Sequence, residues 1–390
     1  MDKIQEILTR GVANIIPGEE ELEKALKSDK KLNIYLGIDP TAPRIHLGHA
    51  VPLRKLQSLA ELGHHVTLLI GDFTALVGDT SDKDSERPIL TDEEIKENFQ
   101  TYKKQAEKIV DFSKVHIKHN SEWLRKLPFD ELIKLTRRFS VNDFITRELI
   151  RKRLDEGKHI RLDEVLYPVM QGYDSYFLDT DVQLGATDQT FNMQAGRTLQ
   201  KVLRNKESFI ITNVFLEGTD GRKMSKSWGN AIWLDDTSDD MFAKVMAIND
   251  DLIIQYFTIA TNVEMNEINE IKTKFLEFDR MYLKKKLAHT IVSELHNKND
   301  ADKAQVYFEK TVQQKELPHE IIELHIKDHF SILETLLRGD LAESKSDAKR
   351  LIEQGGVTLN DEKITNPDSP ISEGILRVGK RRFAKVTFEK

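Results

Sequence analysis

The stretch from Leu32 to Ile70 constrains the fold more than any other part of the chain. Residues Leu32–Gly37 predict a short buried strand, and apolar residues recur at helical spacing over about Leu47–Leu62. The continuous apolar run Val66–Ile70 is typical of a second buried strand. Strand, helix and strand within about 40 residues predict a right-handed crossover between two parallel strands, the repeating unit of an open α/β sheet.

The turn between this strand and its helix is where such a sheet binds a nucleotide, because helix-terminal N–H groups and the helix dipole favour phosphate there. The turn contains neither GxGxxG nor GxxxxGK[ST]. Instead His46 and His49 flank Gly48 in the sequence HLGH, on one face of the first helical turn. Imidazoles can donate to phosphate oxygens, and Gly48 lets a base or ribose approach the backbone. Taken alone, HLGH fits a helix start with two surface histidines equally well.

A second polar motif, GRKMSKSWGN, begins at Gly221 and carries Lys223 and Lys226 with Ser225 and Ser227 beside them. Two lysines three residues apart, with hydroxyls next to them, suit a mobile loop that folds over a triphosphate. A solvated basic loop is the plain alternative for any single run of this kind. The combination of HLGH after a first strand with KMSKS late in the same domain favours nucleotide binding.

Two further loops should face the same crevice, because the carboxyl ends of parallel strands meet at one edge of a sheet. The loop Gly71–Arg87 follows the second strand, and its side chains suit a ligand ammonium or phosphate group. A predicted third strand, Val182–Leu184, ends in GATDQTFN, where Asp188 suits a ribose diol. Ordinary solvated loops remain the alternative. The candidates in the first loop are Thr74, Asp79, Lys83 and Arg87.

The predicted helix Leu162–Leu178 carries a phenol, an amide and a carboxylate at i, i+4 and i+7: Tyr167, Gln171 and Asp174. Such a stripe is costly to bury without partners, which indicates a polar pocket. The alternative is a Tyr167 packed in the core and a solvated Asp174.

Composition limits the class of protein. Lys and Arg number 58 against 65 Asp and Glu, a net charge of −7, so any nucleic-acid surface must be local. The chain has no cysteine, which excludes disulfides and thiolate zinc sites, and its histidines show no HExxH spacing, so no protein metal site is expected. No run of 18 apolar residues predicts a membrane span, and the N-terminus lacks the apolar core of a signal peptide. We therefore expect a cytoplasmic enzyme.

The other elements of the first half are predicted to be mainly helical. Thr91 is expected to cap its helix, because Asp92, Glu93 and Glu94 follow it. The helical insert at about residues 90–160 could form a dimer interface or pack in the ordinary way, and the pattern does not separate the two. The helices are expected at Ile4–Ile16, Glu19–Leu26, Thr91–Phe112, Phe129–Arg138 and Val141–Arg153, and strands at Val115–Lys118 and Phe209–Val214.

The second half is predicted to hold a helical region and a small α+β module. Residues 234–328 are mainly helical and charged, and they thin into a polar linker between Glu309 and Leu324. Ser331–Lys390 has 11 Lys and Arg against 10 Asp and Glu, a net charge of +1. The rest of the chain has a net charge of −8. Cations gather on one helix and one hairpin, which indicates an RNA-contacting surface, with a solvated charged face as the alternative. They are Lys345, Lys349, Arg350, Arg377, Lys380, Arg381 and Arg382.

Over essentially its full length the chain resembles the bacterial tyrosyl-tRNA synthetases, a family of the class I aminoacyl-tRNA synthetases. The stretches that carry the resemblance are YLGIDPTAPRIHLGHA, GDFTALVGD, YPVMQGYD, QLGATDQ and KMSKS. The resemblance implies a Rossmann-type parallel sheet with a helical insert in residues 1–233, an all-α domain and linker in 234–328, and an S-four-type RNA-binding module in 331–390. It also implies a homodimer.

The implied activity is ligation of tyrosine to tRNA(Tyr), with ATP as a substrate that binds together with Mg²⁺. Tyr35 and Asp174 would bind the tyrosine phenol. The other tyrosine-binding residues implied are Asp79, Tyr167, Gln171 and Thr74 at the ammonium group and Gln189 at the carboxylate. The ATP-binding residues implied are Asp39, Gly48, Ala186, Asp188, Met224, Ser225, Lys226 and Ser227. The implied catalytic residues are Thr41 and His46 toward the γ-phosphate, Lys83, Arg87, Lys223 and Lys226 toward the departing pyrophosphate, and His49 of the HLGH motif.

The sequence departs from the family pattern at Ala186, where many members have Gly, and at Thr190 and Phe191, which replace a common Trp-Gly. Three other functions remain to be considered: a tryptophan-specific enzyme of the same class, a non-catalytic RNA-binding protein with this fold, and a generic nucleotidyltransferase. Tyr35 with Asp174 speaks against the first, because an indole offers one N–H and no acceptor.

Overall fold

The computed structural model describes residues 2–79, 90–313, 322–326, 330–342, 344–379 and 382–388. The chain divides into two compact units, Met1–Lys298 and Asn299–Lys390, which are described separately. No helix in these described ranges is long and apolar enough to cross a membrane.

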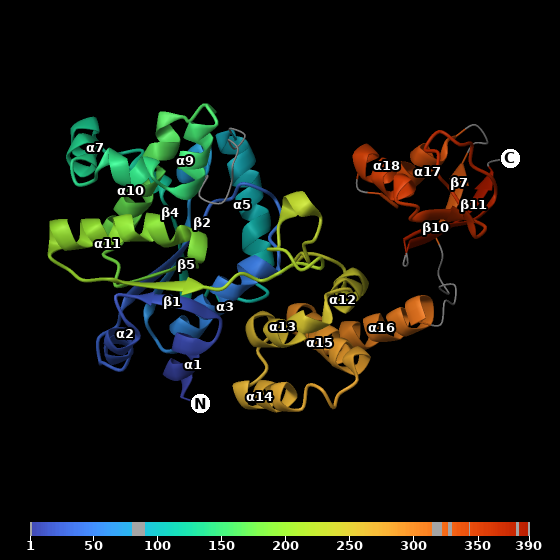
Figure 1. The fold of residues 1–390 in the computed structure, drawn as a ribbon, viewed down its shortest axis with the longest axis horizontal. Helices are drawn as coiled ribbons and strands as arrows, with labels where there is room; N and C mark the ends of the chain where they lie inside the picture. The colour runs from blue at the N-terminus through green and yellow to red at the C-terminus, as the bar shows by residue number, and fades with distance from the viewer. Residues whose placement is uncertain are drawn as a thin grey trace. The chain divides into compact units, whose positions relative to one another are not determined.

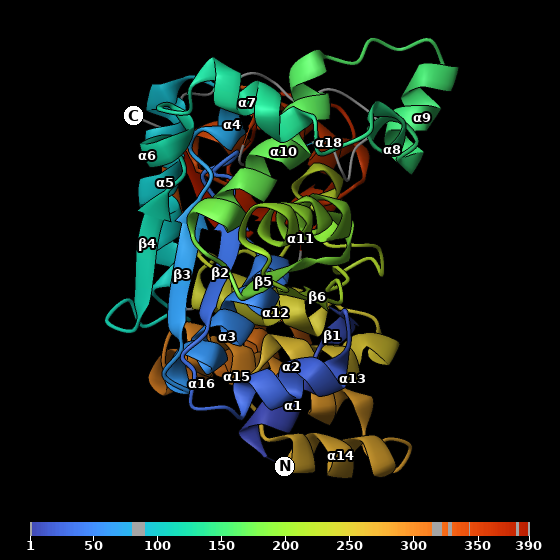
Figure 2. The ribbon, with the colours of Figure 1, turned by 90° about the vertical axis from the view of Figure 1, so that its left-hand side faces the viewer.

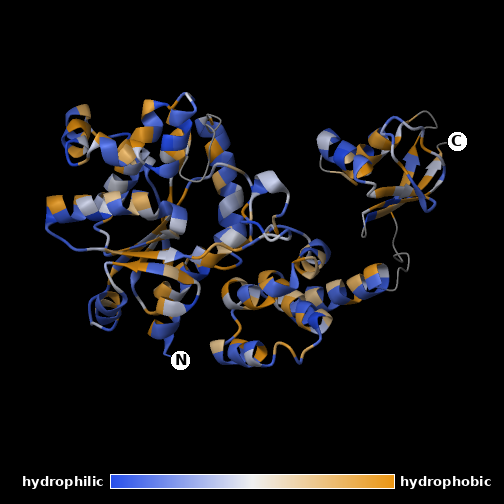
Figure 3. Ribbon diagram, viewed as in Figure 1, coloured by the Kyte–Doolittle hydropathy of each residue, from blue (hydrophilic) through white to orange (hydrophobic). Residues whose placement is uncertain are grey.

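A six-stranded sheet in the order β1-β6-β5-β2-β3-β4 forms the centre of the first unit (Figure 1). All neighbouring strands are parallel except β1, which pairs antiparallel with β6. Figure 3 shows these strands as predominantly apolar, as expected for a sheet covered on both faces. The strands are β1 Val12–Ile16, β2 Asn33–Ile38, β3 His65–Ile70, β4 Val115–His119, β5 Val182–Ala186 and β6 Phe209–Asn213.

The sheet has its switch point at β2, which lies between β3 and β5. Helix α3 (Leu47–Glu61) joins β2 to β3 and packs on one face of the sheet. Helices α10 (Leu162–Phe177) and α11 (Thr190–Arg204) pack together on the other face (Figure 2). Ligands bind at the carboxyl ends of strands beside such a switch point, so the fold places a site where HLGH follows β2.

The remaining helices of the first unit surround this core. A buried ion pair joins two of them: Arg153 of α9 and Glu164 of α10 lie 2.7 Å apart with almost no exposed side-chain surface. The remaining α-helices are α1 Lys3–Thr9, α2 Glu19–Leu26, α4 Thr74–Val77, α5 Asp92–Ala106, α6 Ser121–Leu124, α7 Phe129–Thr136, α8 Val141–Ile145, α9 Glu148–Asp155, α12 Ser238–Met246, α13 Ile253–Ala260, α14 Met265–Thr273 and α15 Arg280–Leu295.

The predicted crossover is confirmed, and so is the N-cap at Thr91, whose hydroxyl accepts from Glu94 N in a reciprocal capping box. The predicted helix Ile4–Ile16 is wrong. Helix α1 ends at Thr9, Gly11 takes a positive φ of 65°, and β1 pairs with β6. The prediction failed because an apolar strand of only five residues, such as β1, is too short for its sequence pattern to distinguish it from a helix. The helix predicted over Val141–Arg153 is also broken, into α8 and α9.

The second unit opens with helix α16 (Lys298–Phe308) and contains a five-stranded sheet in the order β7-β11-β10-β8-β9. Residues Ile322–Ile326 form β7, which pairs parallel with β11, so part of the predicted polar linker is a strand of this sheet. The predicted hairpin is confirmed by the antiparallel pairing of β10 with β11. The elements are α17 Ile332–Arg338, α18 Lys345–Glu353, β8 Val357–Leu359, β9 Glu362–Lys363, β10 Gly374–Val378 and β11 Arg382–Phe388.

Candidate active site

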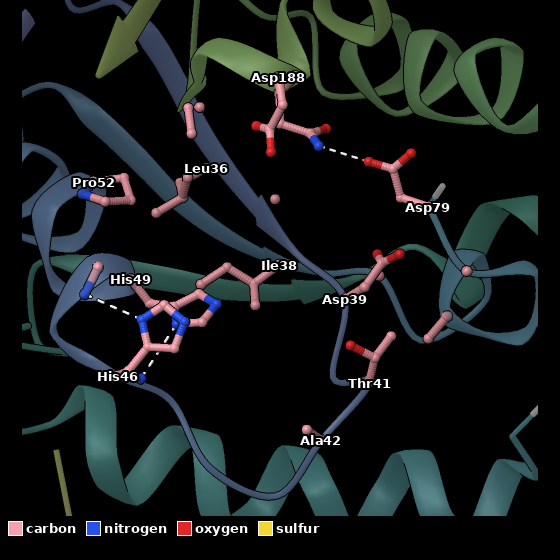
Figure 4. Close-up of a pocket in the computed structure, with 18 of the residues that line it drawn as sticks. Leu36, Ile38, Asp39, Thr41, Ala42, His46, His49, Pro52, Asp79 and Asp188 are labelled. Atoms are coloured by element: carbon pink, nitrogen blue, oxygen red, sulfur yellow. Dashed lines mark hydrogen bonds between the residues drawn. The ribbon is translucent and has the colours of Figure 1, made fainter. Parts of the chain in front are cut away.

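A cavity of about 920 Å³ opens at the carboxyl ends of β2, β3 and β5 (Figure 4). It is lined by residues predicted to bind tyrosine and by residues predicted to bind ATP. Those among the described residues are Tyr35, Asp39, Thr41, His46, Gly48, His49, Thr74, Asp79, Tyr167, Gln171, Asp174, Ala186, Asp188, Gln189, Lys223, Met224, Ser225, Lys226 and Ser227. Lys83 and Arg87 lie outside the described residues, so their predicted roles stay predictions.

His46 caps helix α3 through its imidazole ring. Its Nδ1 accepts from Gly48 N at 3.2 Å, and Nδ1 of His49 accepts from His46 N at 3.2 Å (Figure 4). The two rings lie 4.0 Å apart between centroids. Two histidines thus form the reciprocal box that Ser and Glu make elsewhere, which ties the HLGH motif to the start of the helix.

Burial keeps the His46 ring neutral, and its hydrogen bond determines which nitrogen carries the proton. Burial, with smaller contributions from His49 and Lys223, lowers the pKa of His46 to about 2. The ring is therefore neutral near pH 7, and because Nδ1 accepts a backbone N–H, its proton lies on Nε2. Nε2–H is then a neutral donor that can bind a phosphate oxygen.

Backbone pairing joins the HLGH segment to the residues that follow the KMSKS loop. Leu47 N donates to Ile232 O at 2.9 Å, and Leu234 N donates to Ile45 O at 3.0 Å. Arg44 lies 4.8 Å above the ring of Trp233. Two motifs almost 180 residues apart in the sequence are therefore held at one edge of one cavity.

The KMSKS loop already places one lysine on a predicted ribose ligand. Lys223 Nζ lies 3.0 Å from Asp188 Oδ2 and 4.0 Å from the centroid of the Phe215 ring. Met224 is buried, whereas Lys226 is exposed. The loop therefore lies beside Asp188, at the end of the cavity that is predicted to bind adenosine.

Buried polar groups surround Asp174 at the cavity floor. Its carboxylate accepts from Trp123 Nε1 at 2.7 Å and from Asn120 Nδ2 at 3.1 Å. Burial raises the pKa of Asp174 to about 8, and the two donors oppose that rise. Tyr35 donates to Gln183 Oε1 at 3.2 Å, and burial together with Asp174 raises the pKa of its phenol. Tyr35 and Asp174 thus share one closed polar pocket.

A second polar cluster lies closer to the mouth. Asp39 accepts from Thr74 Oγ1 and from Tyr167 OH, each at 2.8 Å. A Cβ on Gly71 would collide with the Asp39 carboxylate, so this close approach requires glycine. The resemblance assigned Asp39 to adenosine, but in the structure its carboxylate contacts two residues assigned to tyrosine.

Asp79 completes this cluster from the other side, where its Oδ2 accepts from Gln189 Nε2 at 2.6 Å. Together Asp39 and Asp79 place two carboxylates where a ligand ammonium group would be stabilised.

Three residues that shape the pocket were not predicted: Asn120, Trp123 and Gln183. Asn120 directly follows β4, so the rule that strand ends carry sites would have flagged it. Trp123 lies three residues further along. Gln183 is inside β5, where nothing in the sequence distinguishes a site residue from a buried amide. The departures Thr190 and Phe191 begin α11, and Phe191 packs against Phe144 of α8 at 5.3 Å between centroids, so the change is accommodated by the helical insert.

The predicted RNA-binding cations divide into exposed and structural groups. Lys345, Lys349 and Arg350 are exposed on α18. Arg382 donates to Leu341 O, a contact inside the module, and Arg377 lies over the Phe383 ring at 5.4 Å. Lys380 and Arg381 fall outside the described residues.

The chain matches known proteins over nearly its whole length. A family model described as tRNA synthetases class I (W and Y) covers residues 27–313, and an S4 domain model covers residues 335–374. The chain therefore belongs to the class I aminoacyl-tRNA synthetases that include the tryptophan and tyrosine enzymes.

Its full-length relatives identify the branch as the tyrosyl-tRNA synthetase family, as the sequence resemblance predicted. The chain is 44% identical over 401 residues to the tyrosine–tRNA ligase of Carboxydothermus hydrogenoformans, which spans 99% of this chain and 98% of that one. It is 42% identical over 387 residues to that of Thermotoga maritima, with 98% and 96% covered.

Solved structures agree on the fold. The C-terminally truncated mitochondrial tyrosyl-tRNA synthetase of Aspergillus nidulans superposes with a TM-score of 0.66 at 23% identity, over 79% of this chain and 93% of that chain. The Archaeoglobus fulgidus tyrosyl-tRNA synthetase complexed with L-tyrosine gives a TM-score of 0.61 at 24% identity, over 78% and 99%. At these identities the likeness concerns the fold alone.

The neutral state of His46 predicts a pH dependence of stability. A histidine with a folded pKa of about 2 against an ordinary 6.5 binds fewer protons in the folded state. The contribution of neutral His46 to the unfolding free energy is therefore complete above pH 6.5 and is lost as the pH falls below 6.5. Between pH 7.5 and 5.0 the chain should lose about 2 kcal/mol more unfolding free energy than His46→Asn, which keeps a capping side chain. Urea unfolding at both pH values measures this, and equal losses would contradict it. His65→Asn, at an exposed position, should behave like the unsubstituted chain.

Proposed function

We propose that this cavity binds tyrosine and ATP side by side, and that Lys223 and Lys226 act on the triphosphate during the tyrosine–tRNA ligase reaction of the family. The observation that carries this proposal is the single cavity lined by His46, Lys226, Tyr35 and Asp174. If the HLGH and KMSKS motifs had opened onto different faces, one triphosphate could not contact both.

Tyrosine would enter with its phenol toward Tyr35 and Asp174 and its ammonium group toward Asp79, Tyr167 and Gln171. Asp174 already accepts two N–H donors and keeps further lone pairs for a hydroxyl donor. Phenylalanine would displace water from this pocket without replacing its hydrogen bonds. The buried polar groups would then lack hydrogen-bond partners, and this cost in free energy would make phenylalanine bind much more weakly than tyrosine.

Activation needs positioning and charge stabilisation more than covalent chemistry. The tyrosine carboxylate attacks the α-phosphorus of ATP, and the bond to the leaving pyrophosphate breaks. His46 Nε2–H and the lysine ammonium groups would stabilise the charge that spreads over the leaving phosphates. Mg²⁺ carried by ATP would supply further positive charge. No general base or covalent nucleophile is required, because the carboxylate is already ionised.

In the second step the tyrosyl group is transferred to the 3′-terminal ribose of tRNA(Tyr), and AMP leaves. The S4 module supports a tRNA partner, since its exposed helix α18 carries Lys345 and Lys349 one turn apart. The family's role in translation favours the cytoplasm as its location.

Lys226→Ala should leave tyrosine affinity nearly unchanged and lower the rate of adenylate formation roughly 10²-fold or more, as for other removed transition-state contacts. Tyrosine-dependent ATP–pyrophosphate exchange, with tyrosine binding measured by equilibrium dialysis, separates the two effects. Lys134→Gln, on an exposed ion pair of α7, is the control and should change neither. An unchanged exchange rate in Lys226→Ala would refute the role of the lysine.

The double variant Lys345→Gln with Lys349→Gln should spare ATP–pyrophosphate exchange and raise the KM for tRNA. Each lost phosphate contact also lowers the slope of log affinity against log salt by nearly one, so the slope should fall by about 2. The control pair, Lys363→Gln with Lys385→Gln, removes two exposed lysines from the strands of the same module. Equal effects of both pairs would argue against α18 as the RNA-binding face.

We further propose that the helical insert forms a homodimer interface. Large apolar side chains are exposed on the insert helices α7, α8 and α9 and at the first residue of α10, which follows the insert: Phe129 at 77%, Val141 at 68%, Leu154 at 46% and Leu162 at 74%. Such exposure on neighbouring elements indicates a surface that another protein covers. A second copy fits best, because the family expectation is a homodimer.

Phe129→Asp should convert the protein to a monomer, because it places a charge in the apolar interface at no cost to the core. Light scattering should then give the 45.0 kDa of one chain in place of twice that mass. Leu276→Asp, at a position 90% exposed on the α14–α15 connection, is the matched control and should remain dimeric. A dimeric Phe129→Asp would place the interface elsewhere.

A further inference from the structure

The KMSKS loop is built around one buried side chain that lies outside the motif. Asn230 is 2% exposed, although both its sequence neighbours on the loop side, Trp228 and Gly229, are exposed. Its Oδ1 accepts from Ser225 N at 2.9 Å. The amide of Asn230 is therefore bonded to the middle of the motif.

The nitrogen of the same amide holds the N-terminal part of the loop. Asn230 Nδ2 donates to Asp220 Oδ1 at 2.7 Å and to the backbone oxygen of Lys223 at 3.2 Å. Backbone bonding adds to this, since Thr219 N donates to Asn230 O at 3.1 Å. The side chain of Asn230 thus joins Asp220, Lys223 and Ser225.

These bonds determine where Lys223 points. With its backbone held by Asn230, Lys223 reaches Asp188 and lies over Phe215. Lys226 follows directly after the serine that Asn230 holds. A loop without this amide would keep its lysines but would have many positions available to them, and catalysis by charge stabilisation depends on preset positions.

Gly218 is an independent sign of the same arrangement. An added Cβ there would lie 2.5 Å from Asn230 Cγ and 2.6 Å from both Asn230 Nδ2 and Asn230 O. Gly218 is not among the residues with positive φ, so backbone conformation does not explain it. The close approach of Asn230 does.

We propose that Asn230 is a positioning residue that holds the KMSKS loop so that Lys223 and Lys226 meet the triphosphate in the transition state. This inference rests on the proposed function of the two lysines. Asn230 itself is not among the residues that line the cavity. Its effect is expected in the rate of tyrosine activation and not in the affinity for tyrosine.

Asn230→Ala should lower the kcat of tyrosine-dependent ATP–pyrophosphate exchange about tenfold or more, with the dissociation constant of tyrosine unchanged within about twofold. Gly218→Ala should have the same signature, because its new methyl group displaces the Asn230 amide. Asn33→Ala is the control: its amide also donates to a backbone oxygen, of Asp179 at 3.0 Å, but lies at the amino end of β2, away from the cavity. It should leave exchange unchanged.

A double-mutant cycle distinguishes positioning from general destabilisation. If Asn230 acts through the two lysines, adding Asn230→Ala to a variant that already carries Lys223→Ala and Lys226→Ala should slow exchange no further, whereas independent effects would multiply. Multiplied effects, or an Asn230→Ala variant with unchanged kcat, would overturn the positioning role. Failure of the proposed function looks different, because the unsubstituted chain would then show no tyrosine-dependent exchange.

Discussion

The pairing of two backbone segments at the cavity edge is the contact on which the rest of the site depends. Ile45 and Leu47, on either side of His46, bond to Leu234 and Ile232 beyond the KMSKS loop. Backbone hydrogen bonds do not depend on side-chain identity, and they fix the register of both segments. Phosphate-binding groups that come from distant parts of the sequence are thereby kept within reach of one ligand.

Ion pairs strengthen this junction at the rim of the cavity, where Arg44 is one of the lining residues. Arg44 bonds to Asp235 at 2.7 Å and to the buried Asp236 at 3.1 Å. Lys244 of α12 also reaches Asp236, at 2.7 Å. Ion pairs that share a buried carboxylate contribute more to stability than isolated surface pairs, because solvent screens them less. The helical region after the KMSKS loop therefore helps to hold the loop in place.

Prediction from the sequence succeeded where a local pattern has one physical reading. The crossover Leu32–Ile70 was predicted because two apolar runs enclose a helix with clear 3.6-residue periodicity, and a nucleotide site follows from its topology. Prediction failed for β1, a short edge strand whose partner β6 lies almost 200 residues away and cannot be known from local propensity. The same limit applies to Gln183 and Trp123, which support the pocket from behind through tertiary contacts to Tyr35 and Asp174.

Several charged groups of the site already have hydrogen-bond or ion-pair partners within the protein, which ligands must replace when they bind. Lys223 neutralises Asp188, while Asp39 and Asp79 are held by hydroxyl and amide donors. Each of these contacts occupies a group that the proposed function gives to a substrate. Binding of ATP would exchange the Lys223–Asp188 pair for ribose hydroxyls on the carboxylate and phosphates on the ammonium group. Because polar contacts replace polar contacts, the net gain per contact is modest. Binding energy is then available mainly where charge develops, at the lysines and at His46, so the cavity is suited to bind the transition state more tightly than the ground state.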